Sequence, residues 1–211
     1  MLKVYRFLSK EEYANDFADG RFRISTLNAC RAYEDPLQGD PGEGTLSHQI
    51  DETMSGSFED KEFVQIAAQV GVKVGAGADV KLGGVNRMSC VLVDSYLLCA
   101  TNHFAPELLS DTFGKYCVEI SDAVAFGKQI NCELKRRGIQ IRQAWAGNVI
   151  YTPRETFNRT KQSGNIGFVK PADPYEEQRE FRFIYVPQSS IAISPMFLDI
   201  PTARAFCRRI A

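Results

Sequence analysis

The residues best suited to chemistry lie in the segment Tyr175–Arg182, which reads YEEQREFR. If this segment opens a strand, the two-residue period of strands places Gln178, Glu180 and Arg182 on one face. A carboxylate and an amide held in this way can grip a sugar hydroxyl and an incoming nucleophile together. The polar stretch before it, residues 152–174, is too long to be idle in a compact domain. A solvated edge strand with a Glu180–Arg182 ion pair is the alternative interpretation of the same residues.

Two earlier motifs connect this segment with a known family. A short apolar run typical of a strand contains Tyr5-Arg6, and a run of alternating polar and apolar residues ends in Ser25-Thr26-Leu27. Together with Gln178-x-Glu180 in the later segment, these two motifs resemble the Arg–Ser–Glu triad of the ADP-ribosyltransferase-like superfamily. The three motifs occur in the order that this superfamily uses. The chain also resembles, from end to end, a bacterial family of unknown function, through Tyr5-Arg6, Arg23–Leu27, Leu97–Cys99 and Tyr175–Arg182.

The resemblance to the transferases implies that NAD is the substrate and gives each motif a role. Arg6 would hold the phosphates of NAD with its planar set of donors. Ser25 would hydrogen-bond the catalytic carboxylate, with Thr26 beside it in the NAD site. Glu180 would bind the 2′-hydroxyl of the nicotinamide ribose and stabilise the oxocarbenium-like cation that forms as nicotinamide departs. Gln178 would position the acceptor.

The resemblance also implies a stacking aromatic residue and a surface that recognises the acceptor. Either Tyr33 or Phe168 would stack on the nicotinamide ring, and the sequence leaves both open. The loop of residues 153–174 would bind the acceptor, and its basic side chains favour an anionic one; they are Arg154, Arg159, Lys161 and Lys170. A macromolecular acceptor (nucleic acid or protein), a role as a bacterial toxin or anti-phage defence effector, an antitoxin partner and no metal follow from the same resemblance.

A second enzymatic interpretation rests on the acidic loop of residues 34–43, whose acids are Glu34, Asp35, Asp40 and Glu43. Magnesium prefers carboxylates and water as ligands, and two such ions drive in-line displacement at phosphorus. The loop therefore keeps a Mg²⁺-dependent nuclease open as an alternative. The standard catalytic signatures, among them the P-loop and the zinc-protease motif, do not occur in the sequence.

A third interpretation is a non-catalytic module that binds nucleic acid or a partner protein. Residues 1–60 carry 6 basic and 12 acidic side chains, whereas residues 127–211 carry 14 basic and 7 acidic ones. A basic half favours an anionic partner, and Phe157 and Phe168 among the basic residues allow stacking on single-stranded bases. Two oppositely charged solvated faces explain the same asymmetry without any ligand.

The elements that must position these residues favour an α+β fold, because strands outnumber helices and the two are mixed along the chain. We expect mixed, mainly antiparallel sheets and few helices, and the resemblance implies a split NAD-binding-type core. No linker is long enough to divide the chain, so one domain over residues 1–211 is predicted. The expected strands are Val4–Phe7, Arg21–Ser25, Thr45–Met54, Phe63–Val74, Ser89–Val93, Tyr96–Thr101, Tyr116–Ile120, Gly147–Tyr151, Glu180–Val186, Ile191–Ile193 and Met196–Leu198.

Helices are expected where apolar residues recur at helical spacing. Ser9 and Glu12 predict a capping box for a first helix, which Gly20 ends. Further helices are predicted over Leu27–Tyr33, Asp122–Arg137 and Pro201–Arg209. The inner face of the long helix is predicted to consist of Val124, Phe126, Ile130 and Leu134.

The composition predicts a soluble cytoplasmic protein. The sequence has no run of about 18 apolar residues that could span a membrane, and its N-terminus turns acidic too early for a secretory signal. Its six cysteines are scattered without a C-x-x-C pair, which favours reduced thiols over a metal site.

Overall fold

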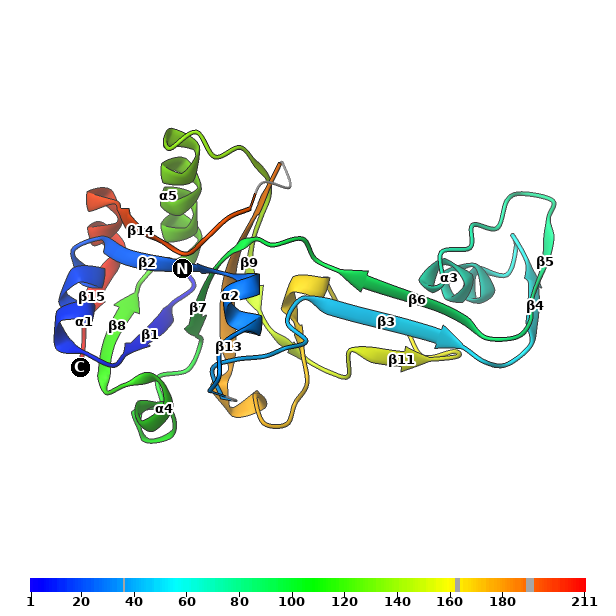
Figure 1. Cartoon of the computed structure of the whole chain (residues 1–211), viewed down its shortest axis with the longest axis horizontal. Coiled ribbons are helices and arrows are strands. Elements are labelled where there is room, and N and C mark those ends of the chain that lie inside the picture. The colour runs from blue at the N-terminus through cyan, green and yellow to red at the C-terminus, as the bar shows by residue number, and fades with distance from the viewer. Residues whose placement is uncertain (36, 162–163, 189–191) are drawn as a thin grey trace. The chain divides into compact units, whose positions relative to one another are not determined.

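A computed structural model describes residues 1–35, 37–161, 164–188 and 192–211 of the chain. The chain folds as two compact units (Figure 1). Unit 1 consists of Met1–Glu43, Val93–Val149 and Ala172–Ala211, and unit 2 consists of Gly44–Leu92 and Ile150–Pro171. The fold is α+β with mainly antiparallel sheets, as predicted from the sequence. One domain over residues 1–211 stays a prediction.

Unit 1 is built on a central sheet with helices packed against it. Its strands are β1 (Val4–Leu8), β2 (Arg21–Thr26), β7 (Tyr96–Thr101), β8 (Tyr116–Ile120), β9 (Ile141–Asn148), β13 (Glu180–Pro187), β14 (Met196–Asp199) and β15 (Cys207–Arg209). Its helices are α1 (Glu11–Ala18), α2 (Leu27–Arg31), α4 (Pro106–Phe113), α5 (Ala123–Arg136) and the 3₁₀ turns η2 (Glu176–Gln178) and η3 (Pro201–Phe206).

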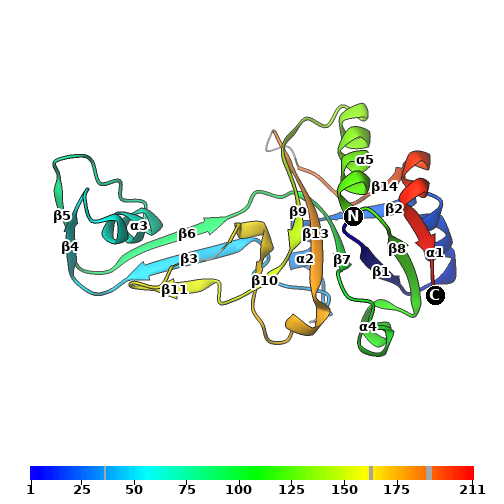
Figure 2. The ribbon, with the colours of Figure 1, turned by 180° about the vertical axis from the view of Figure 1, so that it is seen from behind.

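The sheet of unit 1 forks at β7. A strand has two edges, and β13 pairs with β7 along the whole length of one of them. The other edge is therefore shared: Ser25 of β2 lies opposite Leu97, and Tyr5 of β1 lies opposite Thr101. From this edge β1 and β2 spread apart towards α1 (Figure 1). One branch continues from β2 to β14 and the other from β1 through β8 to β15, while β13 pairs with β9 on its far edge (Figure 2).

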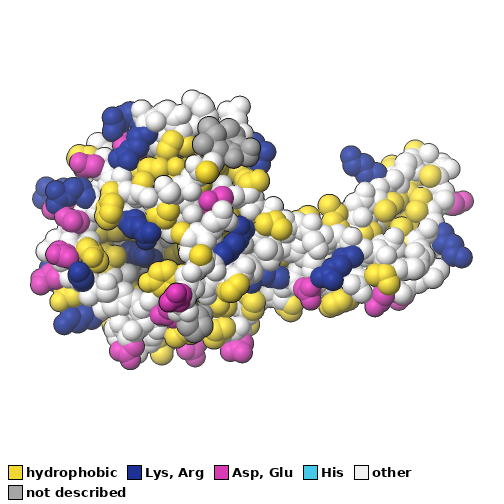
Figure 3. Space-filling model, in the orientation of Figure 1, with side chains coloured by type: hydrophobic (Ala, Val, Ile, Leu, Met, Phe, Trp, Pro, Cys, Tyr) yellow, Lys and Arg dark blue, Asp and Glu magenta, His cyan; other side chains and the backbone are white. Residues whose placement is uncertain are grey.

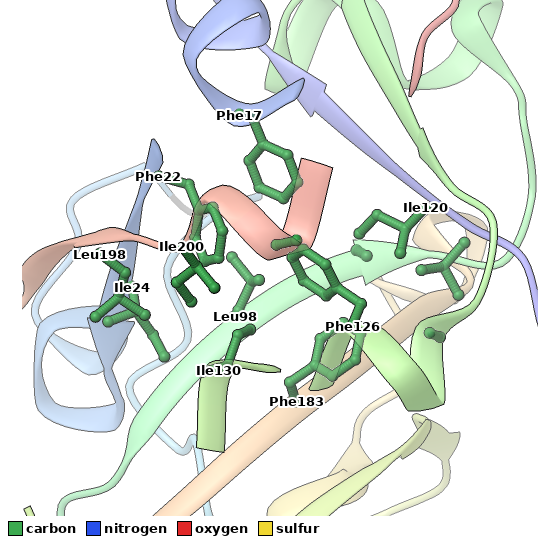
Figure 4. Packing of buried hydrophobic residues seen from close by; sticks show 14 of the residues in the cluster. Phe17, Phe22, Ile24, Leu98, Ile120, Phe126, Ile130, Phe183, Leu198 and Ile200 are labelled. Atoms are coloured by element: carbon green, nitrogen blue, oxygen red, sulfur yellow. The ribbon is translucent and has the colours of Figure 1, made fainter. Parts of the chain in front are cut away.

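The hydrophobic core of unit 1 holds the two branches together. Phe17 of α1 stacks on Phe22 of β2 with 4.8 Å between ring centroids, and Phe126 of α5 lies 5.6 Å from Phe183 of β13. Leu98 of β7 joins the same cluster (Figure 4). One apolar cluster thus packs both branches of the fork against α1 and α5, which fixes the strands that carry the predicted site.

The long helix is confirmed as α5. Asp122 caps it by accepting hydrogen bonds from the N–H groups of Val124 and Ala125, and Gly138 ends it with φ of 81°. Phe126 is fully buried as predicted, but Val124 is 53% exposed. Residues two apart lie on opposite sides of a helix, so Val124 cannot share the inner face of Phe126.

Other predicted elements differ from the structure, and the strand expected over Ile191–Ile193 begins outside the described residues. Lys10, not Ser9, occupies the N-cap of α1, and no side-chain bond caps this helix. The predicted final helix is the 3₁₀ turn η3 only as far as Phe206, and β15 then pairs with β8. Helix α4 was not predicted, although Pro106 occupies its first turn, where proline is favoured.

Unit 2 contains β3 (Thr45–Ile50), β4 (Met54–Ser57), α3 (Lys61–Gln69), β5 (Asp79–Leu82), β6 (Asn86–Val91), β10 (Ile150–Tyr151), β11 (Glu155–Phe157), η1 (Ile166–Phe168) and β12 (Val169–Lys170). Strand β3 lies between β6 and β11 (Figure 2). The strand predicted over Phe63–Val74 is wrong, because Phe63, Ile66 and Ala67 form the buried face of α3. Across the described ranges, no helix combines the length and hydropathy needed to cross a bilayer.

A pair of glycines tests the packing of the β2–β14 branch. Gly20 and Gly138 each follow a helix, with φ of 88° and 81°. A Cβ at Gly20 would overlap the carbonyl oxygen of Ile200, whereas one at Gly138 would meet nothing within 4 Å. Gly138→Ala should therefore lower the free energy of unfolding by about 1–2 kcal/mol, the cost of a left-handed backbone. Gly20→Ala should lower it by at least about 1 kcal/mol more, because backbone must shift.

Urea unfolding of the two variants and the wild type measures this difference. Equal losses in the two variants would contradict the close approach of Gly20 to Ile200.

Candidate functional site

A buried ion cluster lies on β13, where Arg182 is shared by two carboxylates. Its Nε and Nη2 donate to Oε1 and Oε2 of Glu180 at 2.8 and 3.0 Å. Its Nη1 and Nη2 donate to Oε1 and Oε2 of Glu43 at 2.6 and 2.8 Å. The side chains of Arg182, Glu43 and Glu180 are only 1%, 3% and 7% exposed. Burial lowers the pKa of Arg182, but the charges of Glu180 and Glu43 outweigh it and raise this pKa well above its ordinary value.

The alternative interpretation, a solvated edge strand, is wrong, although its Glu180–Arg182 ion pair is present. Strand β13 lies between β7 and β9, and all of its residues are buried. Gln178 belongs to η2, and Arg179, with φ of 42°, turns the chain before β13 begins. The Nε2 atom of Gln178 donates to the carbonyl of Leu37 at 2.7 Å. Gln178 and Glu180 therefore do not share a strand face, because the regular period of two starts only at Glu180.

Ser25 lies at the fork and is linked to this cluster through a cysteine. The Sγ atom of Cys30, from α2, is 3.8 Å from Oγ of Ser25. Burial raises the pKa of the Cys30 thiol, the bond with Ser25 lowers it, and the charges of Glu43, Glu180 and Arg182 act on it further. Cys30 therefore contacts Ser25 and is close enough to the ion cluster for its charges to act on the thiol. The rotamer of Glu180 is held by Arg182, which is the role that the resemblance assigns to Ser25.

Arg6 occupies the opening of the fork. Alternate residues of a strand direct their backbone groups to the same edge, so Leu97, Cys99 and Thr101 of β7 face β1 and β2. Among the described residues, β2 pairs with Leu97 and β1 with Thr101, whereas no strand pairs with Cys99 on this edge. The Nη1 atom of Arg6 donates to the carbonyl of Cys99 at 2.7 Å. The guanidinium thus satisfies a carbonyl that the fork leaves without a ladder partner.

Cys99 brings the parts of the site together. Its carbonyl binds Arg6, and its thiol lies beside the ion cluster. Burial raises the pKa of this thiol well above its ordinary value, and the charge of Glu180 raises it further. The predicted triad of Arg6, Ser25 and Glu180 therefore gathers around β7, and each of its members comes from a different strand that pairs with β7.

The remaining predicted NAD contacts are placed differently. Thr26 is buried, and its hydroxyl caps α2 by accepting a bond from the N–H of Ala29 at 3.2 Å. Tyr33 follows α2 in unit 1 and is 55% exposed. Phe168 is buried in unit 2. Of the two candidate stacking residues, Tyr33 is the one whose ring is accessible.

The predicted acceptor-binding residues all belong to unit 2 but differ in exposure. Arg159 and Lys161 are exposed, and Arg159 lies 3.7 Å from Glu52. Arg154 is partly buried. Lys170 is 4% exposed, so it is not part of an accessible basic surface.

The acidic loop does not gather its carboxylates at one point. Asp40 is buried and accepts a bond from the N–H of Gly42, and Asp35 accepts one from the N–H of Leu37. Glu43 is bound to Arg182. Within the ranges that the structure describes, no three His, Cys, Asp or Glu side chains are close enough together to hold a metal ion. The Mg²⁺ site of the nuclease alternative therefore has no counterpart among these residues.

Sequence reasoning missed Glu43, Cys30 and Cys99 as parts of the site. Glu43 is 139 residues from Arg182, and no local motif connects the two. Comparisons of the chain with protein-family models, with curated proteins and with solved structures find no match.

Figure 3 shows Lys and Arg side chains (dark blue) among hydrophobic ones (yellow) on the face of unit 1 that is in view. The site is thus a buried acidic cluster in a unit whose surface also presents cations.

The ion cluster can be tested by removing its cation. Arg182→Leu should lower the free energy of unfolding by about 3–5 kcal/mol, because it leaves buried carboxylates without their partner. Adding Glu43→Gln and Glu180→Gln to this variant should recover part of the loss, since the amides carry no charge. Urea unfolding at pH 7 measures both. An equal loss in the single and the triple variant would show that the pairing of charge is not the cause.

Proposed function

We propose that the protein transfers ADP-ribose from NAD to a macromolecular acceptor, a nucleic acid or a protein. The proposal is supported by the fork at β7, around which Arg6, Ser25 and Glu180 gather. A guanidinium, a hydroxyl and a carboxylate are the groups needed to hold a pyrophosphate, to orient a ribose and to face a developing cation. We extend the proposal to a role as a bacterial toxin or anti-phage defence effector that an antitoxin restrains.

The charge of the ion cluster suits this reaction. Two carboxylates and one guanidinium carry a formal charge of −1 in a buried environment. In the proposed step the bond between the ribose C1′ and the nicotinamide nitrogen breaks, and its electron pair leaves with nicotinamide. The positive charge then moves to the ribose, and a fixed negative charge stabilises it most where the dielectric is low. The acceptor nucleophile bonds to C1′ and releases its proton.

The same charge determines where the phosphates would bind. The carboxylate pair repels a pyrophosphate, so the phosphates would bind at the cation Arg6 rather than beside that pair. A guanidinium has five N–H donors, and one of those of Arg6 bonds the Cys99 carbonyl. Its side chain is only partly buried. Tyr33, which is exposed near α2, would stack on the nicotinamide ring.

Release of nicotinamide tests the proposed function. The full chain is incubated with NAD labelled in its adenylate phosphate and with cell extract, and nicotinamide and labelled macromolecules are both measured. The wild type should release nicotinamide and label one class of macromolecule, and EDTA should not prevent it. Glu180→Gln should lower the rate by about 100-fold or more, as for other groups that stabilise charge in a transition state. Glu177 is an exposed neighbour of Glu180, so Glu177→Gln is the matched control and should leave the rate unchanged.

Two results would overturn the proposal. One is a wild-type protein that releases no nicotinamide in any extract. The other is full activity in Glu180→Gln. If the inactive protein still retains a nucleic acid or a protein from the extract, the non-catalytic binding module is the correct interpretation.

A further inference from the structure

We infer that Glu43 is a positioning residue for the reaction, which acts on Glu180 through Arg182. The inference rests on the proposed function and deepens it. Glu43 lies at the end of the acidic loop and is buried to 2% exposure. It contributes to the cluster from a segment far from β13, 139 residues before Arg182.

The geometry of Arg182 makes the two carboxylates dependent on one another. The guanidinium is planar, and its Nη2 atom donates to both Glu43 and Glu180, at 2.8 and 3.0 Å. Nε completes the pair with Glu180, and Nη1 completes the pair with Glu43. Each carboxylate is therefore bound in the two-point manner that restricts both distance and plane. A shift of Glu43 rotates the guanidinium and moves Glu180 with it.

Glu43 is itself held in place by its surroundings. The Nε atom of Arg31, from α2, donates to its backbone carbonyl at 2.7 Å. Earlier in the loop, the hydroxyl of Tyr175 donates to the carbonyl of Gly39 at 2.9 Å, and Gln178 bonds the loop near its start. Tyr175 and Gln178 belong to the segment that leads into β13. The loop and the strand that supply the two carboxylates are thus bonded to each other outside the cluster as well.

Glu43 matters for the reaction because it helps to fix where the charge of Glu180 is held. With Glu43 replaced by Gln, Arg182 loses the charged oxygens that restrict its plane, and it holds Glu180 less firmly. A carboxylate that is held less firmly stabilises the ribosyl cation less. The loss concerns the transition state more than the bound substrate, so kcat should fall while KM changes little.

The test is a double-mutant cycle on nicotinamide release by the full chain. We expect Glu43→Gln to lower kcat by at least about tenfold, with KM within about twofold of wild type. In an Arg182→Gln background the same change should have almost no further effect, because the residue through which Glu43 acts is gone. Glu177→Gln is again the control, and thermal unfolding followed by circular dichroism confirms that each variant is folded.

The outcomes separate this inference from the proposed function. An active wild type with unchanged kcat in Glu43→Gln overturns the inference alone. An equal loss in both backgrounds also overturns it, because Glu43 then does not act through Arg182. A wild type without nicotinamide release overturns the proposed function and this inference together. If Glu43→Gln does not fold, Glu43→Asp keeps the charge but shortens the reach, and wild-type kcat in folded Glu43→Asp overturns the inference.

Discussion

Arg182, shared between Glu43 and Glu180, holds the parts of the site together. A buried guanidinium must satisfy its donors inside the protein, and here it does so with two carboxylates from segments far apart in the chain. The pairing connects the acidic loop to β13 and places both beside the cysteines of α2 and β7. Removal of any one of the three groups leaves the others incompletely paired.

A cluster of this kind is a weak source of stability, because the cost of taking charges out of water offsets most of their attraction. The gain in stability therefore does not explain why a charged cluster lies at this position. Phe181 and Phe183 of the same strand belong to the apolar core, whereas Arg182 points to the other face of the sheet and takes no part in that packing. Charged residues at such a position are better explained by the chemistry of the cluster than by the stability of the fold.

The fork in the sheet supplies the second part of the site. Two strands share one edge of β7, so a stretch of that edge lacks a ladder partner, and Arg6 binds the carbonyl at this point. The aromatic core beneath holds both branches, so the opening does not depend on Arg6 alone. The strands that pair with β7 thus bring a cation, Arg6 of β1, and a buried ion cluster on β13 to the same strand.

Patterns in the sequence were enough to predict most of the local elements, the α+β class and, in the alternative interpretation of the segment, the Glu180–Arg182 ion pair. Periodicity also identified the buried face of α5, since Phe126 and its helical neighbours recur every four residues. It failed at α3, because a short apolar run such as that from Phe63 is compatible with a strand or a helix. That β13 is an interior strand, that β1 and β2 share one edge, and that Glu43 meets Arg182 became evident only in three dimensions. These contacts join residues far apart in the chain, and long-range pairing depends on the packing of whole elements, which no local pattern of residues encodes.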